Sequence, residues 1–228
     1  MFLSNPARYL VVLALVAAGV SACGDRQSST GHAVRTLESE PGVAPFSTKE
    51  PETFQAEIVI SSGGTERHIF IAKKQSRRRT DYDYGGREQT TLLSSDRDIV
   101  YSPRLSLYAE TAPDMPSQQP SELENDVTAN LLSSRPDTTY ERLGSENGLS
   151  KFRSRSGDAG EVINFVDDAI GFPVRQEFYS VGADGQKILQ YTMDVRDIKR
   201  EVNDELFAVP ANARKLSLAD FRKLTRQN

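Results

Sequence analysis

Few residues of the chain have types and spacings that could support catalysis. The two histidines are His32 and His68, and a Ser–His–Asp arrangement could use only His68, because His32 falls in a polar stretch rich in proline. Asp167 and Asp168 could act as paired acids, but Asp at the start of a turn commonly bonds its own backbone. We therefore expect no enzyme activity and no cofactor.

A metal site is not expected either. The stretch Asp81-x-Asp83-x-Gly85-Gly86 is similar to a calcium-binding loop, but it lacks the third oxygen ligand before the glycine and the late glutamate. Carboxylates that flank a Gly-Gly hairpin are the simpler interpretation. The only cysteine is Cys23, so the chain can form neither an internal disulfide nor a thiolate metal cluster.

Cys23 has another chemistry, which the residues before it indicate. Arg8 precedes an uncharged run over 9–20 that is rich in Leu, Val and Ala, and small residues follow that run. This order predicts a secretory signal peptide over residues 1–22. A transmembrane helix is not predicted, because the run has about twelve residues and a span needs roughly twenty.

The tetrapeptide Val20-Ser21-Ala22-Cys23 resembles the lipobox of bacterial lipoproteins. The resemblance implies that Cys23 receives a diacylglycerol, that the chain is cut before it, and that the new N-terminus is acylated with a fatty acid such as palmitate. Three acyl chains would hold the protein on a membrane almost permanently. The alternative is an ordinary cleaved signal peptide with a free thiol at Cys23. Gly24 follows Cys23, where an Asp would be the enterobacterial inner-membrane signal, and either membrane stays open.

Composition agrees with a protein of the bacterial cell envelope that faces the periplasm. The chain has 228 residues and a net charge of −4, which argues against nucleic acid as a partner. Residues 23–52 are polar and contain Pro41, Pro45 and Pro51, a composition that buries too little apolar area to fold by itself. We expect a flexible tether there, able to span roughly 30 Å.

From Phe54 onwards the apolar residues alternate, which predicts half-buried strands. About eleven short antiparallel strands are expected between residues 53 and 212, separated by turns such as Gly63-Gly64 and Ala183-Asp184-Gly185. The segment 206–210 is expected to close the sheet. Ser217 should cap a short C-terminal helix within 213–228.

One helix is predicted to interrupt the strands, over residues 121–132. Ser121 and Glu124 form a capping-box pattern, and Leu123, Val127 and Leu131 fall on one face. Because it divides the strands into two sets, we expect this helix to cover one face of the sheet.

Three features together resemble the half-barrel family of the outer-membrane lipoprotein carrier and receptor (Lol type). They are the turn Asp167-Asp168-Ala169-Ile170-Gly171-Phe172-Pro173-Val174, the ending Leu206-Phe207-Ala208-Val209-Pro210, and the early meander over 77–110. The resemblance covers roughly residues 52–212. It implies a mainly β fold: a strongly curved, open antiparallel half-barrel whose concave side is covered by a helix and receives acyl chains. The family usually has a helix before its first strand, and the polar stretch 24–53 departs from that pattern.

Two surfaces are candidates for binding. The first is an apolar cavity, with a packed core as the alternative. Its candidate residues are Leu189, Tyr191, Met193 and Val195, with Ile163 and Phe165 or their neighbours opposite them. The second is a basic hairpin that could contact anionic lipid headgroups, with a solvated turn as the alternative. Its candidate residues are Lys73, Lys74, Arg77, Arg78 and Arg79.

The sequence thus predicts a non-enzymatic lipoprotein held on a membrane by Cys23. Its expected activity is to hold a lipid, an acyl chain or a lipidated protein in the half-barrel. The alternative is an envelope scaffold with a filled core that binds another protein.

Overall fold

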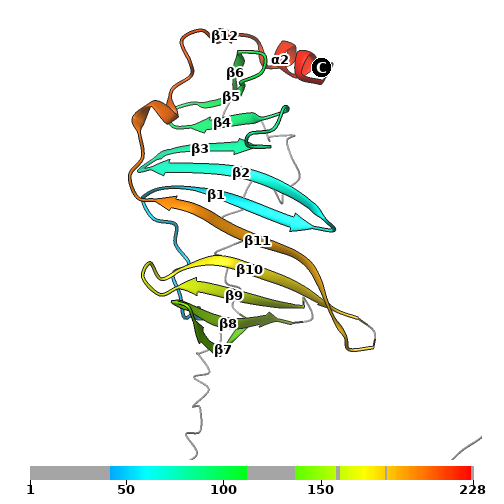
Figure 1. Cartoon of the computed structure of the whole chain (residues 1–228). Helices are drawn as coiled ribbons and strands as arrows, with labels where there is room; N and C mark the ends of the chain where they lie inside the picture. Colours follow the sequence, from blue (N-terminus) through cyan, green and yellow to red (C-terminus); the bar gives the residue numbers. More distant parts are fainter. Residues whose placement is uncertain (1–41, 112–136, 158–159, 183, 227–228) are drawn as a thin grey trace, which may run out of the picture. The chain divides into compact units, whose positions relative to one another are not determined.

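The computed structural model describes residues 42–111, 137–157, 160–182 and 184–226, all within the compact unit Thr36–Asn228. Twelve strands form one sheet in these ranges (Figure 1). The strands are β1 Thr53–Ser62, β2 Thr65–Lys74, β3 Arg77–Tyr82, β4 Thr90–Ser94, β5 Asp98–Ser102, β6 Leu107–Thr111, β7 Thr138–Glu146, β8 Leu149–Ser156, β9 Glu161–Asp167, β10 Phe172–Val181, β11 Lys187–Lys199 and β12 Arg214–Lys215. A 3-10 helix, η1 (Asp204–Phe207), and an α-helix, α2 (Leu218–Arg226), complete the described elements.

The sheet is built from two antiparallel meanders. Its order is β12-β6-β5-β4-β3-β2-β1-β11-β10-β9-β8-β7, so the first meander (β1–β6) and the second (β7–β11) join where β1 pairs with β11. β12 pairs in parallel with β6. The sheet stays open, with β7 and β12 at its two ends, which confirms the predicted open, mainly antiparallel sheet with one strand more than expected (Figure 1).

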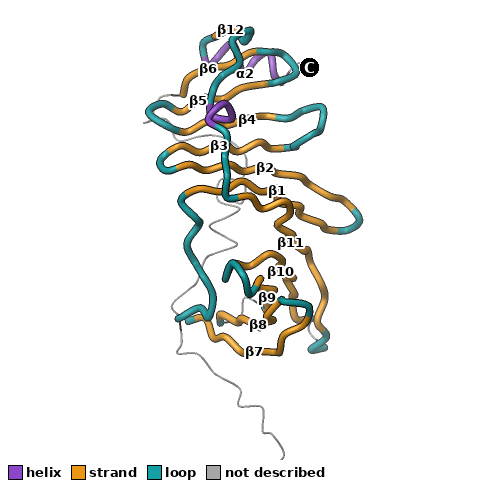
Figure 2. Tube along the Cα trace, turned by 60° about the vertical axis from the view of Figure 1, so that its left-hand side comes forward, coloured by secondary structure: helices purple, strands orange, loops and turns teal. Residues whose placement is uncertain are grey.

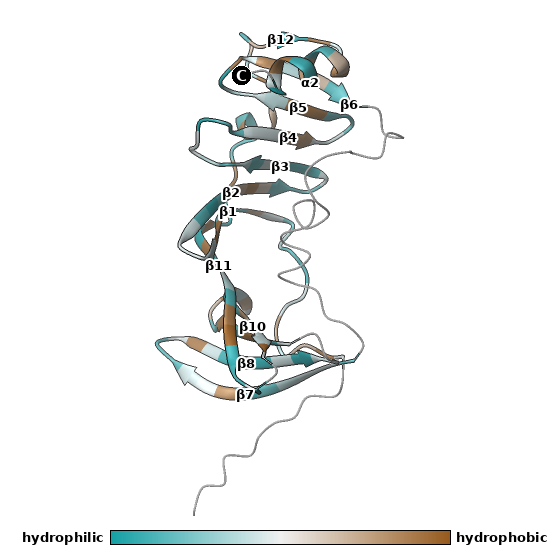
Figure 3. Cartoon of the chain, turned by 90° about the vertical axis from the view of Figure 1, so that its right-hand side faces the viewer, coloured by the Kyte–Doolittle hydropathy of each residue, from teal (hydrophilic) through white to brown (hydrophobic). Residues whose placement is uncertain are grey.

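Alternation along the strands divides the sheet into two faces. Phe54, Ala56 and Ile58 of β1 are buried on one face, which we call the core face. The register pairs Ile58 with Ile69 of β2 and with Val195 of β11, so the core face continues across these strands. The opposite face carries most of the ion pairs of β8–β11, and we call it the charged face. Figure 3 shows the resulting alternation of hydrophobic and hydrophilic residues along the strands.

The prediction that residues 206–210 close the sheet as a strand is wrong. Residues 204–207 form η1 instead, because the side chain of Asn203 accepts a hydrogen bond from the Glu205 backbone N–H and starts a helical turn. Pro210 then lacks the N–H that a strand ladder requires. The chain reaches the sheet again only at β12, which lies in the predicted C-terminal tail.

The predicted C-terminal helix is confirmed as α2. Ser217 caps it by accepting a hydrogen bond from the Asp220 N–H at 3.1 Å. Phe221 is 3% exposed and packs in a second apolar cluster with Val100 and Ala109. α2 therefore covers the β5–β6 part of the sheet, and the packing of its apolar side fixes its orientation.

Residues 42–52, which we call the N-terminal strap, run along the sheet from the β7–β8 region to β1 (Figure 2). The Gly42 N–H donates to the Thr138 carbonyl at 2.8 Å, and the Ser47 N–H donates to the Gly171 carbonyl at 2.9 Å. The expected flexible tether up to residue 52 is thus corrected, because its last part has defined contacts. None of the helices in the described ranges has the length and apolar character that a membrane span needs.

Candidate functional site

The candidate binding surface is the core face where the two meanders meet. Met193 and Val195 of β11 are 4% and 9% exposed and pack with Phe54, Ile58 and Phe172 in one apolar cluster. β-branched and aromatic side chains suit this surface because they pack well on a pleated sheet. The structure therefore places two of the predicted cavity residues at the centre of the apolar core.

A small pocket opens in this cluster. Its volume is about 20 Å³, close to the space that one water molecule needs, whereas sites for small ligands occupy several hundred Å³. In its present form this pocket is therefore too small for an acyl chain. Its lining residues are Pro51, Phe54, Ala56, Ile170, Phe172, Val195, Ile198 and Arg200.

Tyr191 lies beside this cluster, on the same face as Met193, whereas Leu189 lies further along β11. Tyr191 stacks on Phe178 of β10 with ring centroids 4.1 Å apart, and burial raises the pKa of its phenol. A register shift between Phe178 and Tyr179 follows, so that Leu189 pairs with Tyr179 near the end of the β10–β11 hairpin. Leu189 is 48% exposed there.

Ile163 and Phe165 lie on the charged face, so their neighbours, and not these two residues themselves, share a face with Met193. Phe165 pairs with Arg175, and Arg175 pairs with Asp194, the neighbour of Met193. Successive residues of a strand point to opposite faces, so Met193 points away from the face that Asp194 shares with Arg175 and Phe165. Phe165 and Met193 therefore lie on opposite faces of the sheet. Phe165 instead lies beneath the cations of Lys151 and Arg175, at 5.4 and 5.8 Å from its ring centroid.

Polar residues occupy the core face where Ile163 and Phe165 were expected. Asn164 is 2% exposed and Gln176 is 4% exposed. The Gln176 amide donates to the Asn164 oxygen at 2.6 Å, and the Asn164 amide donates to the Ser154 hydroxyl at 3.0 Å. We call these three residues the polar row. The sequence did not reveal it, because two apolar neighbours flank Asn164 and suggest that it points outwards.

The N-terminal strap covers part of the core face beside the polar row. Phe46 packs edge-on against Tyr140, with centroids 5.7 Å apart, and against Phe152 at 6.0 Å. At its other end, Glu50 forms ion pairs with Lys73 at 3.2 Å and Arg78 at 2.8 Å. The strap is thus held by an aromatic contact at one end and by a shared carboxylate at the other.

Every cation of the predicted basic hairpin is paired with a carboxylate. Besides the two that Glu50 holds, Lys74 and Arg77 pair with Asp204 at 2.9 and 2.5 Å. Arg79 pairs with the buried Asp81 at 2.9 Å. These cations bind the strap and η1 to the sheet, and this arrangement favours the structural interpretation of the hairpin over headgroup contact.

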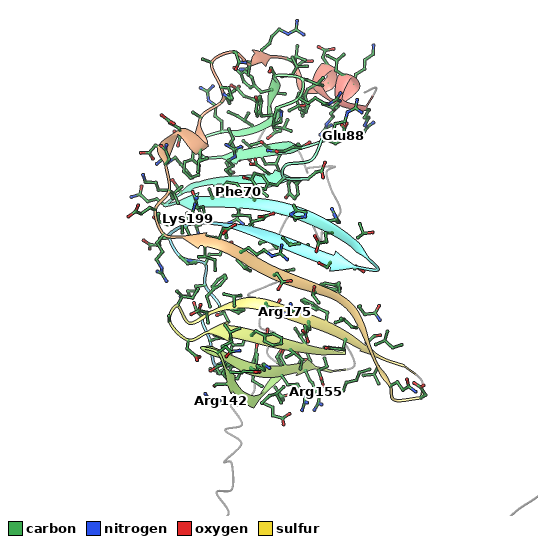
Figure 4. All side chains as sticks on the ribbon, in the orientation of Figure 1. Phe70, Glu88, Arg142, Arg155, Arg175 and Lys199 are labelled. Atoms are coloured by element: carbon green, nitrogen blue, oxygen red, sulfur yellow. The ribbon has the colours of Figure 1, made fainter. Side chains whose placement is uncertain are left out.

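On the charged face, a nearly buried carboxylate lies among three cations. The side chain of Glu161 is 5% exposed, and its oxygens lie 2.7 Å from Lys187, 2.8 Å from Arg155 and 3.2 Å from Arg153. Figure 4 labels Arg155 and Arg175 on this part of the sheet. Arg153 also pairs with Glu141 at 2.6 Å, so opposite charges alternate across β7, β8 and β9.

The residues considered for catalysis have structural partners. His68 lies 2.6 Å from Glu57 through Nδ1, on the charged face. Asp167 accepts a hydrogen bond from the Ala169 N–H in the turn that precedes β10, and Asp168 accepts one from Ser150. In the described ranges no group of three or more His, Cys, Asp or Glu residues could hold a metal ion.

Two sets of predicted site residues lie outside the described residues. They are Cys23 and the covering-helix residues Leu123, Val127 and Leu131. Their roles stay predictions from the sequence.

Comparison with known proteins finds no matching family model and no matching curated protein. Solved structures that are similar include an uncharacterized conserved protein from Thermus thermophilus, at a TM-score of 0.44 and 14% identity over 73% of this chain and 91% of that one. They also include the Pseudomonas aeruginosa MucA/MucB complex, at a TM-score of 0.44 and 15% identity over 73% of this chain and 59% of that one. A DUF1329 family protein from Desulfovibrio piger matches at a TM-score of 0.31 and 12% identity over 71% of this chain and 91% of that one. Similarity at this level carries no conclusion about function.

Proposed function

We propose that this protein is a lipid-anchored protein of the bacterial envelope that binds an amphipathic ligand on the core face of its sheet. The ligand would be a lipid, an acyl chain or the acyl group of a lipidated protein. The observation that carries the proposal is the core face itself. Ile58, Met193 and Val195 offer an apolar surface for a chain, and Asn164 and Gln176 lie next to it with amides that can bond an ester or amide carbonyl.

Binding of a chain in the described pocket requires that pocket to open. The described pocket of about 20 Å³ is smaller than any acyl chain, so part of the cover must move away from it. The N-terminal strap is a suitable moving part, because it contributes Pro51 to the pocket and is not a strand of the sheet. A ligand would then replace the strap on the core face.

The second candidate function is a protein-binding scaffold. The small size of the pocket favours it specifically, because a filled core needs no ligand. In that case the same sheet would present its charged face to another envelope protein. The two functions differ in what they require of the core face, and this difference can be measured.

The test uses the chain from residue 23 with Cys23→Ser, which keeps every described element. Native mass spectrometry should show a co-purified lipid, and a fluorescent fatty acid should bind. Val195→Leu adds one methylene to the pocket wall and should weaken fatty-acid binding about tenfold, as expected for one methylene in an apolar site. Val59→Leu, a buried residue on the charged face, is the matched control and should leave binding unchanged. A ligand-free mass without fatty-acid uptake would reject ligand binding in favour of the scaffold.

A further inference from the structure

A group of cations without carboxylate partners lies at the C-terminal end of the described residues. Arg214 of β12 and Lys223 and Arg226 of α2 are exposed, and none has an ion pair in the part of the chain that the structure describes. Arg222 is half-buried, and within those same ranges its Nε has no hydrogen-bond partner. We call these four residues the C-terminal patch. It contrasts with the basic hairpin, where Glu50, Asp204 and Asp81 pair with all five cations.

The packing of α2 fixes the direction in which the patch points. At 100° per residue, Arg222, Lys223 and Arg226 fall within one arc of the helix. Leu218, Phe221 and Leu224 fall on the other side and pack in the cluster with β5 and β6, where Phe221 is 3% exposed. Because the helix cannot rotate without exposing Phe221, Lys223 and Arg226 are held towards solvent.

Stability alone does not account for this patch. Arg222 and Arg226 are separated by four residues, and Lys223 and Arg226 by three, so like charges are neighbours on the helix surface and repel each other. The helix macrodipole favours cations in the last turn and offsets some of this cost. It does not explain Arg214, which precedes the helix on β12. The nearest acid on α2, Asp220, caps its N-terminal end through Ser217.

We propose that the C-terminal patch binds the anionic headgroups of phospholipids in the membrane that carries the protein. Guanidinium groups bind phosphate oxygens in a bidentate manner, and three of the four cations are arginines. The net charge of the chain is −4, but charges further away than the Debye length of about 8–10 Å are largely screened, so the patch acts locally.

The position of the patch in the sheet determines how this contact would orient the protein on the membrane. α2 and β12 lie at the end of the sheet away from β7 (Figure 1), and the N-terminal strap begins at β7, where Gly42 bonds Thr138. Attachment at both ends would lay the sheet along the membrane, where a lipid-binding core face has short access to its ligand. This step rests on the proposed anchor for the identity of the membrane, whereas the headgroup contact itself can be tested without the anchor.

The experiment measures flotation of the chain from residue 23 with Cys23→Ser on vesicles of phosphatidylcholine, with and without phosphatidylglycerol. We expect binding only to vesicles with phosphatidylglycerol, and weaker binding as salt rises. Each cation near an anionic surface changes affinity about fivefold, so the variant Arg214→Gln, Lys223→Gln, Arg226→Gln should bind roughly 100-fold more weakly. A matched control removes three exposed cations elsewhere, through Arg87→Gln, Arg196→Gln and Lys199→Gln (Lys199 is labelled in Figure 4).

The control should bind like the parent chain, and all substituted side chains are exposed, so thermal unfolding should be unchanged. Equal losses in the two triple variants would overturn the proposal, because the effect would then come from net charge. Failure of the parent chain to bind phosphatidylglycerol vesicles would also overturn it. So would binding to polyglutamate without binding to vesicles, which would indicate an acidic protein partner. None of these results depends on lipidation of Cys23 or on ligand binding by the core face.

Discussion

Replacement of Glu161 by Gln tests whether the ion pairs of the charged face stabilise the sheet. The carboxylate is 5% exposed and lies within 3.2 Å of three cations. Gln has the same shape but no charge, so Glu161→Gln would leave Arg153, Arg155 and Lys187 without their shared counter-charge. A nearly buried cluster of like charges is costly when its counter-ion is removed.

The expected loss follows from the exposure of each partner. Arg155 and Lys187 are 52% and 44% exposed, so solvent screens their pairs, and each contributes about 0.2–1 kcal/mol. Arg153 is 24% exposed, and a charged contact at that burial contributes about 1.5 kcal/mol. The free energy of unfolding should therefore fall by about 2–3.5 kcal/mol, which lowers the Tm by about 4–14 °C for a domain of this size.

The effect should depend on pH with a definite sign. Burial by itself raises the pKa of Glu161, but hydrogen bonds from Lys187 and Arg155 and the charge of Arg153 outweigh burial and lower the pKa below its ordinary value. A carboxyl with a lowered pKa in the folded state stabilises fully above its unfolded pKa, and this contribution is lost as pH falls through the folded pKa. The difference between the parent chain and Glu161→Gln should be complete at pH 7 and shrink in acid, where Glu161 is protonated.

Urea unfolding of both proteins at pH 7 and at steps down to pH 3 measures this difference. Glu146→Gln is the control, because Glu146 is 66% exposed and its one ion pair within the described ranges is with Lys151 at 3.1 Å. Its loss should stay below about 0.5 kcal/mol. The reasoning would be refuted by a Glu161→Gln loss no larger than that of the control, or by a difference that stays constant down to pH 3.

Two further predictions concern the strap and the anchor. Glu50→Gln removes the carboxylate that two cations of β2 and β3 share, and it should cost about 1–2 kcal/mol and speed amide exchange in residues 42–52, whereas Lys49→Gln should leave exchange unchanged. Equal exchange in both variants would show that Glu50 does not hold the strap. Cys23→Ser should move the protein from the membrane fraction to a soluble or unprocessed form, with Ser28→Ala as the unaffected control. Membrane fractionation of Cys23→Ser like that of the parent chain would reject lipidation.

The strands could be predicted because their signal is local. The alternation of Phe54, Ala56 and Ile58 is a property of five consecutive residues, and the Gly63-Gly64 turn, with φ of +57° and +81°, directs the chain back without reference to the rest of the fold. The same holds for the cap of α2 at Ser217. Features that are encoded within one turn or one strand therefore appear in the structure as the sequence indicates.

The faces of β9 and β10 could not be predicted, because register is not local. Shifts between Pro173 and Arg175, and between Phe178 and Tyr179, change the pairing on both sides of β10. One such shift moves a side chain to the other face without any change in the apolar pattern. The apolar Phe165 is therefore covered by cations on the charged face, and the polar Asn164 is buried on the core face, separated from Met193 by Gln176. Hydrophobicity alone predicts the reverse.

The partners of the charged residues are also set by contacts between distant parts of the chain, so the sequence does not reveal them. Five cations within 73–79 look like a binding surface in the sequence, but their partners come from far along the chain: Glu50 lies 23 residues from Lys73, and Asp204 lies 130 residues from Lys74. They became internal contacts because β2 and β3 lie where the strap and η1 both cross the sheet. The C-terminal patch is less dense in the sequence, yet it lies at a sheet end where α2 uses its apolar side for packing and leaves its cations to solvent. Whether a basic cluster is available to a partner thus depends on which chain segments the topology brings over it. In this protein the strap and η1 cover the cations of β2–β3, so the proposed membrane contact lies at α2 instead.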